Sequence, residues 1–249
     1  MNNDEKIKII SNFLSAIPAD RYQVLLKKDG KETSFVAWKD GKKSLYLTKD
    51  EVLENLAGLK ARNTKNYEIF IKPFTSRNYF IVVNNVSLKS LDAMAASGFK
   101  PCVRTLLNPG ENPSKHLQQV VLMIPKCDGE QDAFRVKYAL DKLVRRYGEG
   151  SVSVQEPMVV PGFKIQGDYA TLERSAPRLC TELAKGVDGF RKALVEAGMS
   201  LTAPNRREGQ SEEEFERQEA IYKSQMHGDA LDNEKISARI KFKNKFDKC

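Results

Sequence analysis

The chain has 249 residues, of which 41% are hydrophobic and 30% are charged. This balance is typical of soluble globular proteins, and the length suits one or two domains with a sizeable core. No segment reaches the run of about 18 apolar residues that a membrane-spanning helix needs. The N-terminus, MNNDEKIKII, mixes acids with lysines and lacks the apolar core of a secretion signal. We therefore expect a cytoplasmic protein with no membrane partner.

The net charge of +8 and the isoelectric point near 9.2 favour a polyanionic partner such as nucleic acid. Charge alone does not decide the matter, because many basic proteins bind no polyanion.

The cysteines are scattered without a C-x-x-C spacing, and the two histidines lie far apart. This pattern argues against both a structural zinc site and disulfides. We interpret the thiols as buried or inert, since cysteine commonly serves as a small hydrophobic residue. They are Cys102, Cys127, Cys180 and Cys249.

The first part of the chain predicts a helix over residues 4–17, where apolar residues recur at helical spacing. Three short strands follow, joined by Asp-Gly turns in which glycine takes a positive φ at no steric cost. The strands span residues 22–27, 33–38 and 44–47. Thr48 and Glu51 then form a capping box for a helix that reaches Leu59.

A hairpin with a longer loop is predicted at the centre of the chain. Its two β-branched and aromatic runs are Tyr67–Lys72 and Tyr79–Val83, separated by residues 73–78. Ser87 then offers an N-cap to a helix that ends at Gly98.

Asn84 and Asn85 close the second strand of this hairpin and face the start of the next helix. The carboxyl end of a buried strand is where α/β folds place chemistry. A structural interpretation is also open, because asparagine bonds nearby backbone and favours turns and helix starts.

Two more strands, a helix and an apolar stretch complete the predicted core; they span residues 102–107, 117–124, 131–147 and 152–163. The order of these elements predicts an α+β fold, a small mixed β-sheet with helices packed on one face.

The character of the sequence changes near residue 171. Apolar residues at three- and four-residue spacing predict a long amphipathic helix from Leu172 to Gly198, followed by a linker at 202–210. We therefore predict an α+β domain over residues 1–170 and a C-terminal helical region over residues 171–249.

Three short motifs stand in order around the centre of the chain: LKARN at 59–63, IFIKP at 69–73 and VNN at 83–85. They resemble the RepB-like plasmid replication primases, a branch of the archaeo-eukaryotic primase fold whose motifs read L-K-x-x-N, I-x-I-x-P and V-D-D. The resemblance covers about residues 8–168. It implies a primase-like mixed β-sheet with packed helices, in a protein from a plasmid, a phage or another mobile element.

The same resemblance implies a degenerate active site. In the family, both aspartates of V-D-D and a third aspartate hold divalent metal, and a histidine follows the third aspartate by three positions. This sequence has Asn84, Asn85 and Ser153 at the aspartate positions and Glu156 at the histidine position. Amides carry no charge to attract a hard cation that must face a triphosphate. We therefore expect no catalytic residues, no metal and no other cofactor.

Candidate nucleic-acid-binding residues come from the same region and from the basic C-terminal tail. We expect Lys72, Arg77 and Lys115 to line one face of the sheet and contact phosphates, and Tyr79 to stack on a base. Lys115 and Gln118 keep two residues of the family's P-K-N-Y-Q-A-W segment. The alternative is that these side chains are solvated surface. The complete set is Lys72, Arg77, Tyr79, Lys115, Gln118, Lys164, Lys241, Lys243 and Lys245.

Three hypotheses about function follow. The first is a primase-fold protein that makes no primers and binds single-stranded DNA or structured RNA. The second is an active DNA primase that uses Mg²⁺ or Mn²⁺ held by other carboxylates, with Glu156 and Asp168 as candidates. The third is a protein-docking module whose basic surface binds an acidic partner or inhibits a nucleoprotein complex.

Overall fold

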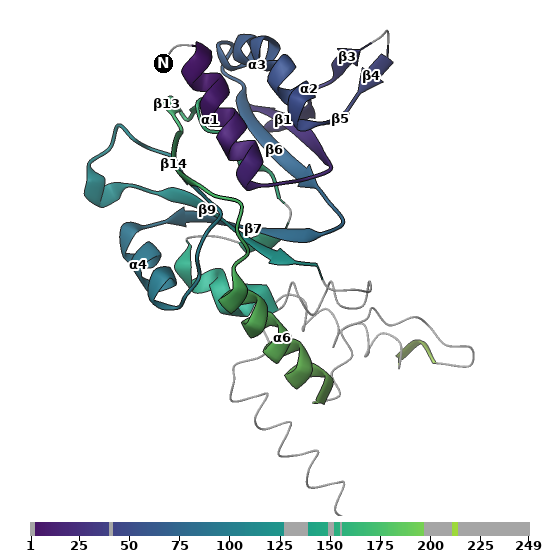
Figure 1. Cartoon of the computed structure of the whole chain (residues 1–249), viewed down its shortest axis with the longest axis vertical. Coiled ribbons are helices and arrows are strands. Elements are labelled where there is room, and N and C mark those ends of the chain that lie inside the picture. The colour runs from purple at the N-terminus through teal and green to yellow at the C-terminus, as the bar shows by residue number, and fades with distance from the viewer. Residues whose placement is uncertain are drawn as a thin grey trace, which may run out of the picture. The chain divides into compact units, whose positions relative to one another are not determined.

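The computed structural model describes residues 3–39, 42–126, 139–148, 152–154, 156–196 and 211–213. The chain divides into two compact units, residues 1–126 with 140–186 and residues 127–139 with 187–249. Every strand within the described ranges lies in the first unit (Figure 1). No helix among the described residues is long and apolar enough to cross a membrane.

The first sheet has the strand order β11-β6-β1-β2, with β5 also paired to β1, and all of these pairs are antiparallel. Residues along β6 alternate between buried and half-buried. This alternation means that one face of the sheet lies in the core while the other is open. The strands are β1 Arg21–Lys28, β2 Lys31–Ser34, β5 Tyr46–Leu47, β6 Glu68–Phe74 and β11 Met158–Val159.

The second sheet has the strand order β10-β7-β9-β8-β14, again with antiparallel pairs. Every residue of β9 before Pro125 is buried, and four consecutive residues of β7 are buried. Continuous burial of this kind requires cover on both faces of the sheet. The strands are β7 Asn78–Val86, β8 Val103–Leu106, β9 Gln118–Pro125, β10 Val152–Val154 and β14 Thr171–Ser175.

Two short hairpins stand apart from the main sheets. One pairs β3 Ala37–Lys39 with β4 Lys42–Ser44, and the other pairs β12 Lys164–Ile165 with β13 Asp168–Tyr169.

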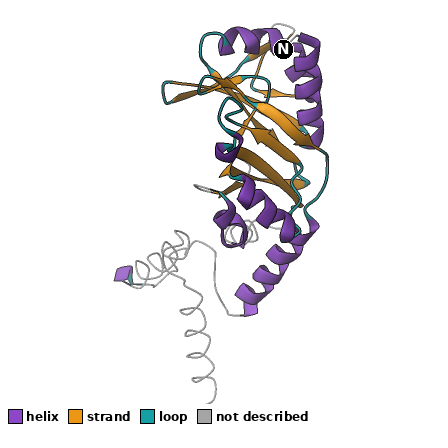
Figure 2. Cartoon of the chain, turned by 90° about the vertical axis from the view of Figure 1, so that its left-hand side faces the viewer, coloured by secondary structure: helices purple, strands orange, loops and turns teal. Residues whose placement is uncertain are grey.

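The helices cover the sheets from different sides. Helix α1 runs along the strands and buries Ile10, Phe13 and Leu14 in a core shared by both sheets (Figures 1 and 2). On the other face of the second sheet, α4 packs near residues 139–147, where the Phe99 and Tyr147 rings meet edge-on at 5.9 Å. The helices are α1 Asn3–Ala16, α2 Lys49–Glu54, α3 Leu56–Asn63, α4 Leu88–Ala96 and α6 Thr181–Glu196, with 3-10 turns η1 Pro113–Lys115 and η2 Arg145–Tyr147.

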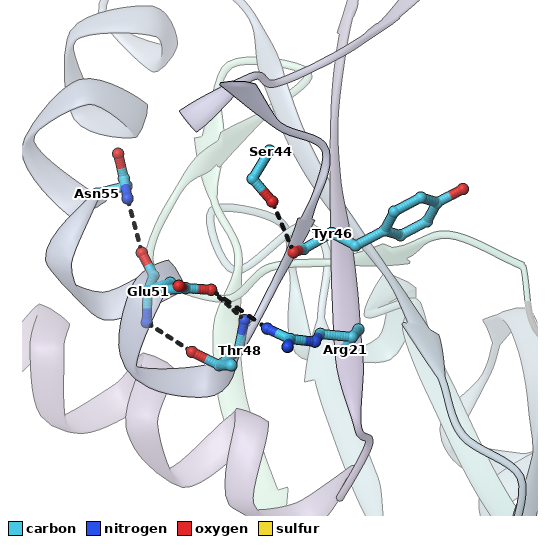
Figure 3. A network of polar contacts seen from close by, with 6 residues as sticks. All are labelled: Arg21, Ser44, Tyr46, Thr48, Glu51 and Asn55. Carbon is cyan, nitrogen blue, oxygen red and sulfur yellow. Dashed lines mark hydrogen bonds and ion pairs between the residues drawn. The ribbon is translucent and has the colours of Figure 1, made fainter. Parts of the chain in front are cut away.

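The predicted capping box is confirmed at the start of α2 (Figure 3). Thr48 Oγ1 accepts a bond from the main-chain nitrogen of Glu51 at 3.2 Å, and Glu51 Oε2 accepts one from the main-chain nitrogen of Thr48 at 2.9 Å. The same carboxylate lies 3.6 Å from the Arg21 guanidinium. Asn55 Nδ2 donates to the Glu51 carbonyl at 2.8 Å, and at Asn55 the single predicted helix breaks into α2 and α3.

Other local predictions are also confirmed. Asp29 and Gly30 both have positive φ, 51° and 75°, in the turn between β1 and β2. Ser87 Oγ accepts from the main-chain nitrogen of Ser90 at 3.2 Å, and α4 ends just before Gly98, whose φ is 73°.

The predicted central hairpin is wrong. Strands β6 and β7 form at the expected places, but β6 pairs with β1 in the first sheet and β7 pairs with β9 in the second. The reason is burial: β6 alternates, as suits a sheet with one open face, whereas β7 is continuously apolar and needs a sheet covered on both faces. The strands therefore belong to two sheets, within an α+β fold that is confirmed.

Two further element predictions need correction. The predicted strand 33–38 is interrupted at Phe35 and Val36, between β2 and β3. The predicted helix from Leu172 is also wrong at its start, because residues 171–175 form β14 on the edge of β8 and the helix begins only at Thr181. Pairing with the free edge of β8 outweighs the local apolar spacing, and Pro177 disfavours a helix running through it.

Part of the predicted C-terminal region lies outside the described residues. This applies to the linker at 202–210, to the basic tail and to residues 131–138 of the helix predicted over 131–147, of which residues 139–144 are helical. The division of the chain at residue 170 stays a prediction.

We predict that Thr48→Ala lowers the free energy of unfolding by about 0.5–2 kcal/mol, because it removes the acceptor for the first turn of α2. Urea denaturation followed by circular dichroism would measure the change. Thr64→Ala is the control: Thr64 lies exposed after α3, and its hydroxyl donates to the Lys60 carbonyl rather than capping an N-terminus. An equal loss in both variants would contradict the assignment of the capping box.

Candidate nucleic-acid interface

The end of β7 carries a β-bulge. Val83 pairs with Val120 and Val86 pairs with Gln118, so the register shifts across the two asparagines. Asn85 has a φ of 54°, a left-handed conformation that asparagine tolerates better than most residues. The bulge also needs Gly148 beside it, because a Cβ on Gly148 would lie 2.5 Å from the Asn84 carbonyl oxygen.

A buried amide connects this bulge to the first sheet. Gln119 is 3% exposed. Its Nε2 donates to Asn84 Oδ1 at 2.7 Å, and its Oε1 accepts from the main-chain nitrogen of Val159 at 2.8 Å. The side chain thus links β7 and β9 of the second sheet to β11 of the first.

The residues at these positions do not fit a divalent metal. The side-chain oxygen of Asn84 accepts a bond from Gln119, and an amide adds no negative charge. Ser153 of β10 pairs through its backbone with Val82 of β7. Glu156 is exposed in a cleft on the first sheet. Within the part of the chain that the structure describes, no three His, Cys, Asp or Glu side chains gather as ligands.

A first cleft, of about 420 Å³, opens on the first sheet. Register places Gln23 of β1 between Lys72 of β6 and Tyr46 of β5, so these residues form a row across the sheet. Lys72 Nζ lies 5.8 Å from the centre of the Phe74 ring, which meets the Tyr46 ring edge-on at 5.0 Å. The lining residues are Gln23, Leu25, Glu32, Thr33, Ser34, Lys72, Glu156 and Pro157.

A second cleft, of about 400 Å³, holds Lys115 together with two carboxylates, Glu111 and Asp168; its other lining residues are Leu107, Asn108, Ile165 and Gln166. It shares no lining residue with the first cleft. The expectation that Lys72 and Lys115 line one sheet face is therefore wrong, because Lys72 lies on β6 and Lys115 on the 3-10 turn between β8 and β9. Glu156 and Asp168 likewise line different clefts.

Arg77 and Tyr79 lie together with a lysine that the sequence analysis missed. Lys126 donates from its main-chain nitrogen to the Arg77 carbonyl at 2.9 Å and from Nζ to the Thr75 carbonyl at 2.6 Å. Its Nζ also lies 5.5 Å from the centre of the Tyr79 ring. The sequence feature that could have pointed to Lys126 is its position just after the apolar run of β9, whose last residue, Pro125, pairs with Asn78 at the start of β7. The next residue along β7, Phe80, is fully buried.

The remaining predicted residues have varied positions. Gln118 is 3% exposed, so its side chain is buried against the sheet and is not part of an open binding surface. Lys164 is exposed on β12, with Nζ 5.3 Å from the centre of the Tyr169 ring. Lys6 Nζ lies 5.7 Å from the centre of the same ring. Burial lowers the pKa of Lys6, and the charge of Lys60 lowers it further. Lys241, Lys243 and Lys245 lie outside the described residues.

The interpretation of the cysteines as buried thiols is confirmed for Cys102 and Cys180. Burial raises the pKa of Cys102 to about 12, so it stays protonated at neutral pH and is a poor nucleophile. Cys127 and Cys249 lie outside the described ranges.

The family model described as RepB DNA-primase N-terminal domain matches residues 15–186. Two crystal structures are similar to this chain, each with a TM-score of 0.59, 17% sequence identity and coverage of 78% of this chain. One is the catalytic domain of primase RepB′ in complex with initiator DNA, of which 97% is covered, and the other is primase RepB′, of which 64% is covered. No curated protein sequence matches. These findings confirm the predicted resemblance and the α+β class.

We predict that Gln119→Leu lowers the free energy of unfolding by about 1–3 kcal/mol, because it leaves the main-chain nitrogen of Val159 buried without its acceptor. Chemical denaturation would measure this loss. Gln118→Leu is the matched control: it is an equally buried neighbour whose Oε1 has no partner among the described residues. We expect that change to be close to neutral. A larger loss for Gln118→Leu than for Gln119→Leu would contradict the structural role of the Gln119 amide.

Proposed function

The chain belongs to the RepB DNA-primase N-terminal domain family, and we propose that it binds single-stranded DNA without synthesising primers. The observation that carries this proposal is the hydrogen bond from Gln119 to Asn84, at the strand end where the resemblance implies a metal-holding aspartate. In this proposal the chain keeps the primase fold, and neutral amides take the place of the carboxylates that would bind metal.

Primer synthesis requires charge neutralisation at a triphosphate and activation of the attacking hydroxyl, both of which divalent metals supply. A metal would need carboxylate oxygens directed at one point. Here Asn84 and Asn85 supply amides, and Glu156, one of the two carboxylates considered as replacements, lies in the cleft on the first sheet. The alternative of an active primase would need Glu156 and Asp168 to act together, and they line separate clefts.

DNA binding is supported by the overall charge and by the surface residues of the first unit. The net charge is +8, and one similar solved structure is a primase catalytic domain in complex with initiator DNA. Lys72 lies beside aromatic rings on the open face of the first sheet, and Arg77 lies beside Lys126 and Tyr79. Cations that are interleaved with aromatic rings are what single-strand binding surfaces use. We also propose that the protein comes from a plasmid or another mobile element, in keeping with the family.

We predict that the purified protein incorporates no nucleotides on a single-stranded DNA template in the presence of Mg²⁺ or Mn²⁺, because its amides cannot hold the ions. Incorporation of labelled nucleotides would be measured on gels. Glu156→Gln is the control variant. Template-dependent products that disappear in Glu156→Gln would overturn the proposal in favour of the active primase.

We predict that affinity for an oligonucleotide falls steeply with salt, because binding phosphates releases counterions. Lys72→Ala and Arg77→Ala should each reduce the slope of log affinity against log salt by about 0.7 for a single strand. Lys115→Ala should reduce it less, because Lys115 shares its cleft with two carboxylates. Fluorescence anisotropy at several salt concentrations would give the slopes.

The control for these variants is a triple change of Lys241, Lys243 and Lys245 to alanine in the basic tail. If only the tail variant loses binding, the surface of the first unit is not the site. If the unaltered protein binds no nucleic acid near physiological salt, the protein-docking hypothesis replaces DNA binding.

A further inference from the structure

The hairpin of β3 and β4 exposes the chain's sole tryptophan. Trp38 is 66% exposed, the largest exposed fraction among the large hydrophobic side chains that the structure describes. Strand geometry explains its direction: Ala37 is 4% exposed and belongs to the core, and successive side chains of a strand point to opposite faces. The residue after Ala37 therefore faces solvent, and it is the residue type with the largest stacking surface.

Positive charge accompanies this ring. Trp38 pairs across the hairpin with Lys43, and Lys43 Nζ lies 5.1 Å from the centre of the Trp38 ring. The segment Ala37–Ser44, AWKDGKKS, contains three lysines against one acid. An exposed aromatic face next to cations suits a ligand with both bases and phosphates.

The hairpin also adjoins the first cleft. Strand β4 ends at Ser44, and Leu45 leads directly into β5, whose Tyr46 is 48% exposed and pairs with Gln23 in the lining of that cleft. Lys43 and Tyr46 are three residues apart, a span of at most about 11 Å. A strand of nucleic acid that follows the row of Tyr46, Gln23 and Lys72 would thus reach the hairpin within a short distance.

We propose that the β3–β4 hairpin binds single-stranded DNA by stacking Trp38 on an unpaired base while Lys43 contacts the adjacent phosphate. This inference rests on the proposed function and assigns it a specific contact. Bases in a duplex already stack on each other, so the hairpin selects unpaired strands. A duplex offers phosphates to Lys43 but no unstacked base to Trp38.

The test uses the full chain and a labelled oligo(dT) as the probe, with a duplex of equal length for comparison. Because Trp38 is the sole tryptophan, its emission should be quenched when oligo(dT) binds. Trp38→Leu, which keeps an apolar side chain but removes the aromatic face, should weaken oligo(dT) binding about fivefold or more, whereas Trp38→Phe should weaken it about twofold at most. Lys43→Gln should reduce the salt slope by about 0.7.

Leu88→Ala is the control, since Leu88 is also an exposed apolar residue, on α4, and is 45% exposed. Thermal melting of each variant checks folding. If oligo(dT) binds equally well to the unaltered chain and to Trp38→Leu, without quenching, the hairpin contact is overturned while DNA binding stands. If neither oligo(dT) nor the duplex binds to the unaltered chain, the proposed function and the hairpin contact both fail.

Discussion

The Gln119 side chain is the connection on which the arrangement of the two sheets depends. A side-chain amide has an acceptor oxygen and a donor NH₂ group. In Gln119, which is buried, the oxygen and the nitrogen each make a hydrogen bond. An unpaired buried amide costs roughly 1–3 kcal/mol, so the pairing is enforced once the strands are buried. Strand β11 has only two residues, Met158 and Val159. With so few ladder bonds of its own, this strand also relies on the Gln119 contact and on the burial of Met158 in the core.

The bulge at Asn84 and Asn85 is shaped by the same contact and by its neighbours. The close approach of Gly148 to the Asn84 carbonyl leaves no room for a side chain. Asn84 is therefore held from its side chain by Gln119 and crowded at its backbone by Gly148. A position that is fixed on both sides in this way suits a structural residue, in keeping with our proposal that amides stand here in place of charged ligands.

Lysines placed over aromatic rings recur across the first unit. Lys28 lies 5.3 Å from the Tyr67 ring centre, and similar pairs join Lys72 to Phe74 and Lys126 to Tyr79. In such pairs the methylene stem covers apolar surface while the ammonium stays hydrated. The positive charge of the protein is thus held at defined places on the first unit, rather than being carried only by freely rotating side chains.

The features that could be predicted from sequence are those that nearby residues decide. The Thr48–Glu51 capping box, the Ser87 cap and the Asp29-Gly30 turn depend on contacts within four residues, and all three form. The pairing of β6 and β7 depends on distant strands. The sequence holds little signal of this, because Ile69–Ile71 is as continuously apolar as Phe80–Val83, and the two strands differ only in how they are buried.

The candidate site could be predicted only in outline. The asparagine pair was found at the end of a buried strand, but the choice between Gln118 and Gln119 could not be made from sequence. Adjacent residues of a strand face opposite sides of the sheet, and because both sides are covered here, both glutamines are buried. Gln119 finds a partner at each end of its amide, whereas Gln118 Oε1 finds none among the described residues. That outcome is decided by the position of Val159, forty residues away along the chain.

The outer strands of the two sheets have a consequence for association with other chains. Strand β2, at one margin of the first sheet, has four residues, KETS, of which three are exposed. Strand β14, at one margin of the second, includes Glu173 and Arg174 and is irregular between Leu172 and Arg174. Short, charged or irregular margins are poor templates for added strands. These two margins therefore resist edge-to-edge aggregation, even though the interiors of both sheets are among the most apolar segments of the chain.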